Sequence, residues 1–172
     1  MAIYQHHLTV VPRQTLLRIW NIIPANIILH GNPAFDEDDL IDIMWWDNVT
    51  VDFEKIEKRI LDFTNQVEWT KSSKDVKDFG DNETNDISIG QGDSGLLEEM
   101  SFRIDLRKID RQFIDNVLTI VKDLDCLLLD GQGNLFEPTL HKLADNLRTS
   151  DAYEFITDPK DFLDKLGKER LG

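Results

Sequence analysis

The chain has 172 residues, of which 41% are apolar, and its 33 acidic side chains against 19 Lys and Arg residues give a net charge of −14. A chain of this length and apolar content can fold around one core, so we predict a single domain over residues 1–172 and exclude global disorder. Because like charges repel, the acidic balance argues against nucleic acid and anionic membranes as partners. A lone cysteine excludes an intramolecular disulfide and, beside only four histidines, argues against a structural zinc site.

The N-terminal residues 1–7 bear on the cellular compartment. They contain neither a basic segment nor an apolar run, so we expect no secretion signal. The longest apolar runs, such as 126–129, are far shorter than the roughly 20 residues that cross a bilayer. Cys126 begins that run, as is typical of a buried, unreactive thiol. We therefore expect a soluble cytoplasmic protein with no membrane partner.

The first part of the chain alternates between strand and helix patterns. β-Branched and aromatic residues over 2–11 predict a strand, and Pro12 suits the first turn of an apolar-striped helix that Pro24 ends. The run 27–29 is too short to decide between a strand and a buried loop. Apolar residues at helical spacing then predict helices over 36–46 and 53–65, and a strand follows over 67–70.

Residues 71–95 differ in composition, because Gly, Asp, Asn and Ser dominate them. Ile87-Ser88-Ile89 is the one apolar interruption and a candidate short strand. We expect a mobile loop here, followed by a β-hairpin that turns at Gly92-Asp93-Ser94-Gly95.

The clearest pattern is an alternation of apolar and polar residues over 97–107. A period of two predicts a strand with one buried face and one polar face that looks toward water or a partner. Asp110 then caps a helix over 110–124. The apolar residues of the alternating strand are Met100, Phe102, Ile104 and Leu106, and its polar residues are Ser101, Arg103, Asp105 and Arg107.

The remaining elements begin with a buried strand over 126–130 and a hairpin turn at 130–134. Leu135-Phe136 begins the return strand, Pro138 opens a helix, and a last helix covers 158–167.

The strong elements follow one another as β-α-β-β-α-β, which predicts an α+β fold. In this interpretation helices pack on one face of an antiparallel sheet, in the split βαβ arrangement of ferredoxin-like sandwiches. Residues 12–52 form a helical insertion, and 131–172 form a C-terminal helical extension. An α+β sandwich with another strand order is the alternative.

No motif predicts a catalytic residue, a metal site or a cofactor. Neighbouring residues of a strand point to opposite faces, so His6 and His7 cannot chelate one metal in the usual way, and we expect one to be half-buried and the other exposed. The run from Asp130 suggests a calcium loop, but Leu135 occupies the position that needs glycine. No nucleophile stands beside a base in the sequence, so enzymatic activity is left open and unsupported.

Two surfaces are candidates for a partner. An acidic run at the start of the predicted helix 36–46 is either a solvated helix start or a docking surface for a basic protein. Trp45 and Trp46 follow it and point about 100° apart on a helix, so one can pack in the core while the other anchors a partner. The polar strand face, with Arg103, Asp105 and Arg107, is the second surface. The acidic residues of the first surface are Asp36, Glu37, Asp38, Asp39 and Asp42.

In general character the chain resembles the immunity proteins of bacterial polymorphic-toxin systems. The features that carry this resemblance are the strand 99–107, the hairpin 129–138 and the Trp45-Trp46 pair. The resemblance implies a small acidic protein without catalytic residues that binds a toxin domain and blocks its active site. A metal-dependent or carboxylate-based enzyme and a homodimeric structural or regulatory subunit are the alternative functions.

Overall fold

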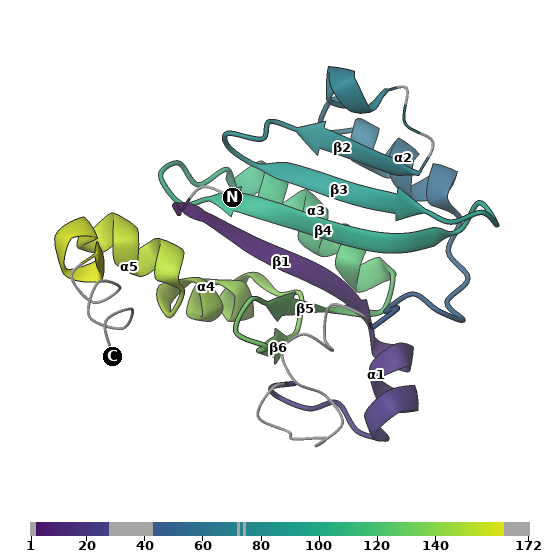
Figure 1. Cartoon of the computed structure of the whole chain (residues 1–172), viewed down its shortest axis with the longest axis horizontal. Helices are drawn as coiled ribbons and strands as arrows, with labels where there is room; N and C mark the ends of the chain where they lie inside the picture. The colour runs from purple at the N-terminus through teal and green to yellow at the C-terminus, as the bar shows by residue number, and fades with distance from the viewer. Residues whose placement is uncertain (1–2, 28–42, 72, 74, 164–172) are drawn as a thin grey trace.

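The computed structural model describes residues 3–27, 43–71, 73 and 75–163. In these ranges six strands form one antiparallel sheet in the order β2-β3-β4-β1-β5-β6 (Figure 1), so the fold is α+β as predicted. The strands are β1 (Gln5–Pro12), β2 (Val76–Gly80), β3 (Asp86–Gln91), β4 (Leu97–Asp105), β5 (Cys126–Asp130) and β6 (Leu135–Phe136). The helices are α1 (Arg13–Trp20), α2 (Phe53–Leu61), α3 (Arg111–Asp123), α4 (Leu140–Arg148) and α5 (Asp151–Thr157).

The main core lies between one face of the sheet and the helices α2 and α3, which pass behind the sheet in Figure 1. Met100, Phe102 and Ile104 of β4 are buried on this face, as predicted for the apolar side of the strand. Ser101 (8% exposed) and Asp105 (2% exposed) on the other face are also buried, contrary to the prediction of a polar face open to water. The helix predicted after this strand is confirmed, since the Asp110 side chain accepts a hydrogen bond from the Phe113 backbone N–H, 3.0 Å away.

A second, smaller core lies on the opposite face of the sheet, where α1 packs. Val11 of β1 and Leu127 of β5 point to this face, and Leu16 of α1 covers them. Helices therefore cover both faces, contrary to the prediction of one covered face. The reason is that β1 and β5 also carry apolar residues on the second face, and α1 removes these from water. The α1 helix ends at Asn21, whose φ of 58° breaks the helical path.

Residues 67–70 do not form the predicted strand. Glu68–Thr70 is a short 3-10 helix (η1) that packs beside β2. The Thr70 hydroxyl accepts a hydrogen bond from the Asp78 backbone N–H, and the Val67 N–H donates to the Asp78 carbonyl. These contacts give the backbone N–H and carbonyl of Asp78, on the outer edge of the sheet, hydrogen-bond partners without a further strand.

The segment 71–95 holds two strands, β2 and β3, where the sequence predicts a loop with one short strand. Ile87 and Ile89 do lie in β3, and the hairpin between β3 and β4 turns at residues 92–95 as predicted. The strand β2 escapes prediction because edge strands keep polar residues that face water and show no continuous apolar pattern.

Residues 36–42 lie outside the described residues. The remainder of the helix predicted over 36–46 is wrong, because residues 43–44 are irregular and 45–48 form a turn. The helix α5 has no sequence prediction. Residues 159–163 are helical, in line with the start of the last predicted helix. Within the described ranges, no helix combines the length and the apolarity needed to cross a bilayer.

Candidate functional site

Arg103, a predicted contact residue, lies on the sheet face opposite α2 and α3 and pairs with Asp86 of the neighbouring strand. Both side-chain oxygens of Asp86 accept hydrogen bonds from the guanidinium, one of them from Nε at 2.9 Å. Asp86 is only 5% exposed, and this burial raises its pKa although Arg103 opposes the shift. The pair therefore has a structural role inside the sheet.

Asp105 and Arg107, the other predicted residues of this strand, also bind each other. Arg107 donates to both carboxylate oxygens at 2.9–3.2 Å, and this pairing holds the pKa of Asp105 below its ordinary value. The guanidinium lies over the Tyr4 ring, 3.4 Å from its centroid. Asp105 is 2% exposed under this cover, so the acid is out of reach of a partner while Arg107 stays accessible.

The tryptophan pair divides between core and surface. Trp46 is buried in the main core at 4% exposure. Trp45 is partly buried, packs against both cores and stacks on Trp20 with 6.3 Å between ring centroids. The 45–48 turn is fixed to α1, because the Thr15 hydroxyl donates to the Trp45 carbonyl at 2.6 Å.

Four large apolar side chains are exposed on α1, just after it and just before the 45–48 turn. We name them the α1 patch: Leu17 (44% exposed), Ile22 (54%), Ile23 (37%) and Met44 (69%). Met44 also borders a cavity of about 180 Å³ between the turn and the β3–β4 hairpin. Asp47 and Glu98 contribute carboxylates to the lining of this cavity.

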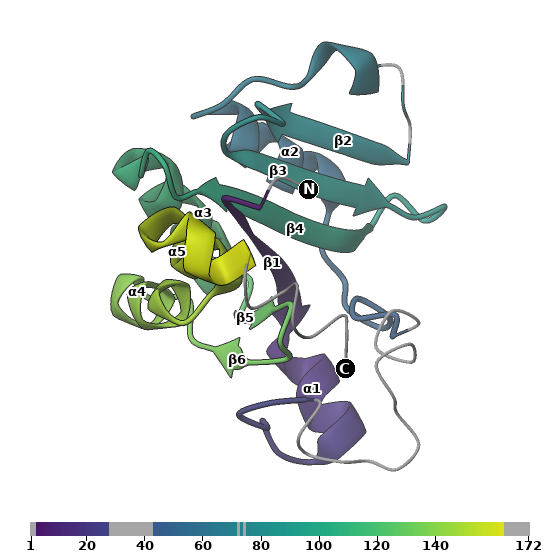
Figure 2. The same cartoon turned by 60° about the vertical axis from the view of Figure 1, so that its left-hand side comes forward.

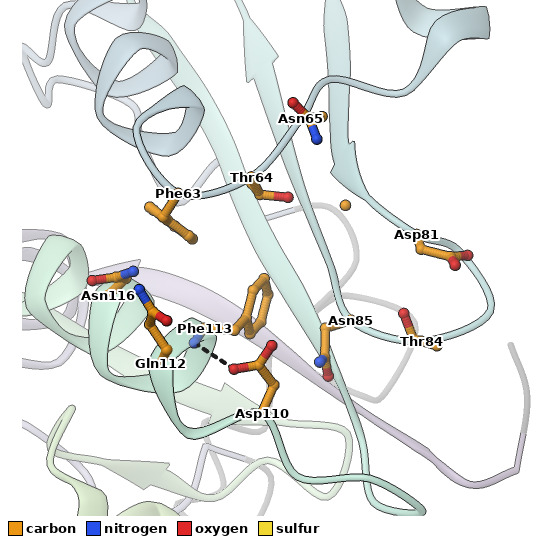
Figure 3. A pocket seen from close by; sticks show the side chains of 11 residues that line it. Phe63, Thr64, Asn65, Asp81, Thr84, Asn85, Asp110, Gln112, Phe113 and Asn116 are labelled. Atoms are coloured by element: carbon orange, nitrogen blue, oxygen red, sulfur yellow. Dashed lines mark hydrogen bonds between the residues drawn. The ribbon is translucent and has the colours of Figure 1, made fainter.

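A polar cavity of about 350 Å³ lies between the end of α2, the start of α3 and the β2–β3 turn (Figure 3). Thr64, Asn65 and Asn85 project around the hollow in Figure 3. Its two carboxylates already have structural partners, since Asp110 caps α3 and Asp81 accepts the Glu83 backbone N–H at 2.8 Å. The lining can donate and accept hydrogen bonds but presents no charged group free of local bonds among the described residues.

A third cavity, of about 540 Å³, lies beside the first half of β1 and is lined by both His6 and His7. His6 is 8% exposed, and its Nε2 lies 2.8 Å from the Asn146 side-chain oxygen. The Asn146 amide nitrogen donates to Asp130 at 2.5 Å. Because a carboxylate only accepts, the amide oxygen must face His6, and the His6 Nε2 must carry a proton.

Burial favours the neutral form of both histidines. It lowers the pKa of His6 below 6.5, against the hydrogen bond that His6 donates to Asn146 and the charges of Asp130 and Asp151. Burial and the charge of Arg103 lower the pKa of His7. Neutral His6 then keeps a bare Nδ1 that can accept a hydrogen bond.

Sequence analysis does not find this site, because its members come from parts of the chain that are far apart. Asn146 lies 140 residues from His6 and carries no signal in an amphipathic helix. The described residues contain no group of three or more His, Cys, Asp or Glu side chains that could hold a metal. Burial raises the pKa of the Cys126 thiol to about 12, so this cysteine is not a nucleophile.

No protein-family model matches the chain, and neither the curated proteins nor the solved structures contain a match.

Proposed function

We propose that this protein is a non-catalytic binding module that sequesters a basic protein through the α1 patch. The observation that carries this proposal is that four large apolar side chains, 37–69% exposed, lie on α1, just after it and just before the 45–48 turn. Extensive exposed apolar surface marks interaction sites in proteins. The two segments are held together by the Thr15–Trp45 hydrogen bond and by the stacking of Trp45 on Trp20.

Charge identifies the chemistry of the partner. The net charge of −14 attracts cationic proteins and accelerates their association at low salt. Next to Met44, the cavity that Asp47 and Glu98 line suits a lysine or arginine side chain, whose aliphatic stem contacts Met44 while its head meets Glu98. Asp47 already pairs with Arg18 at 3.1 Å.

The general resemblance to immunity proteins extends this proposal to a toxin domain, such as a nuclease, as the basic partner. The acidic residues Asp36, Glu37, Asp38, Asp39 and Asp42 lie outside the described residues and enter the proposal from the sequence alone. Asp42 is two residues from Met44 along the chain. We further propose that the protein acts in the cytoplasm, in line with its single, buried cysteine.

We also propose that the core of the fold is the ferredoxin-like arrangement. The support is the chain order β1, α2, β3, β4, α3, β5 together with the sheet order β5-β1-β4-β3. In this interpretation β2 and β6 extend the two edges of the sheet.

Affinity capture from the source organism tests the binding proposal with matched variants. The test variant is Leu17→Asp with Met44→Asp, and the control is Leu61→Asp, which alters an exposed leucine on α2. We expect the natural protein and the control to retain the same basic protein and the test variant to lose it. Retention of that protein by all three baits, or capture of no basic protein by the natural chain, contradicts the proposal. Self-association in the purified sample would instead favour the homodimer.

A further inference from the structure

The first half of β1 has a neighbouring strand on only one side in the described structure. β4 pairs with residues Gln5 to Thr9, whereas the pairing with β5 begins at Leu8. The helices α4 and α5 lie together beside this end of β1 in both views (Figures 1 and 2). The cavity of about 540 Å³ lies between this end of β1, the β5–β6 turn and the start of α5, and its volume suits a small organic molecule.

His6 supplies an acceptor to this cavity. Its Nε2–H is committed to Asn146, and its Nδ1 has no hydrogen-bond partner among the described residues. His6 is 8% exposed and is one of the residues that line the cavity. An unprotonated Nδ1 has a lone pair that can accept a hydrogen bond from a ligand there.

The cavity is also negatively charged. Asp130 accepts four hydrogen bonds of 2.5–2.9 Å from N–H groups of Gln132, Asn134 and Asn146, but it pairs with no cationic side chain among the described residues. Asp151 lies at the rim and likewise makes no ion pair within those residues. No lysine or arginine is among the described residues that line the cavity. A cation therefore gains from two carboxylate charges at this place.

Part of the remaining wall is apolar, beside the polar residues Gln5, Gln132 and Ser150. Ile3, Ala152 and Phe162 line the cavity, and Ala152 and Phe162 are nearly buried. We propose that this cavity binds a small primary amine with an apolar body, whose ammonium group donates hydrogen bonds to His6 Nδ1 and to the Asp151 carboxylate. The apolar body lies against Phe162 and Ala152, and the charge of Asp130 stabilises the ammonium from behind.

Calorimetric titration of the full chain with three probes of similar shape tests this proposal. The probes are 2-phenylethylamine, 2-phenylethanol and 3-phenylpropionate, which differ in charge and in their ability to donate. We expect saturable binding of the amine, at least about fivefold weaker binding of the alcohol, and no binding of the acid. Equal affinity for the amine and the alcohol, or no saturable binding of the amine at millimolar concentration, contradicts the proposal.

Two variants locate the binding. We expect Asp151→Asn to weaken amine binding by about fivefold, whereas Asp93→Asn, on the distant β3–β4 turn, leaves it unchanged. The His6 ring C–H resonances should shift on addition of the amine in the natural protein, which reports contact at His6 without a substitution of this buried residue. Binding that is indifferent to Asp151→Asn and leaves the His6 resonances unmoved excludes this cavity as the site.

Discussion

The Asn146 amide determines the tautomer of His6. Its nitrogen donates to the Asp130 carboxylate, so its oxygen accepts from the imidazole and fixes the proton on Nε2. A single amide thus ties β1, β5 and α4 together at one point. Elsewhere, ion pairs join Arg103 to Asp86 and Arg107 to Asp105. The charged residues of strand 97–107 that look like a binding surface in the sequence are therefore bonded to neighbouring side chains.

The burial of His6 predicts a pH dependence of stability. Its folded pKa lies below 6.5, so the unfolded chain takes up the proton first as the pH falls. The contribution of His6 is fully present above pH 6.5 and is lost as the pH falls from there toward the folded pKa. We expect urea unfolding to show a larger loss of stability between about pH 7.5 and pH 5.5 for the natural protein than for His6→Gln. Equal losses would mean that His6 titrates alike in both states.

The Asp86–Arg103 pair predicts a large effect of removing one partner. Arg103→Met leaves the buried Asp86 charge without its cation, and we expect a loss of about 3 kcal/mol in the free energy of unfolding. Arg111→Met breaks an ion pair with Asp115 whose side chains are 64% and 51% exposed, and should cost less than about 1 kcal/mol. Chemical denaturation measures both losses, and similar values for the two variants would contradict this assignment.

At the scale of elements, the sequence predicts those helices and strands that depend on interactions between residues close together in the chain. The buried apolar residues of β4 and the Asp110 cap of α3 depend on neighbours within a few residues, and both are found as predicted. By contrast, β2 and the 3-10 helix Glu68–Thr70 depend on contacts with distant segments, such as the β2–β3 pairing, and their sequences carry no strong periodicity. The cavity beside His6 escapes prediction for the same reason.

Thr70 links the 3-10 helix to β2 and offers a test of that link. Its hydroxyl accepts from the Asp78 N–H at 3.1 Å and donates to the Val67 carbonyl at 3.1 Å, and the residue is 4% exposed. We expect Thr70→Val to cost about 1–2 kcal/mol, because it leaves a buried N–H without its partner. Hydrogen exchange should show faster exchange of the Asp78 amide, and unchanged protection there would contradict the link.

At the scale of the whole molecule, β1 separates two surfaces of different character. The helix α1, which carries part of the α1 patch, follows the end of β1 (Figure 1). The cavity proposed to bind an amine is lined by residues at the start of the strand. The net charge of −14 acts over the whole surface and favours cationic partners at both places. Because the two sites share no residue, substitutions at one should leave binding at the other unchanged.

Hydrogen–deuterium exchange on the complex with the captured basic protein tests the central claim most directly. If the partner binds at the α1 patch, its binding should slow amide exchange in residues 13–23 and 43–48 relative to the free protein. The strands β3 and β4 serve as the internal reference and should exchange alike in both samples. Protection concentrated on the sheet face that carries Arg103, with residues 13–23 and 43–48 unchanged, would contradict the account.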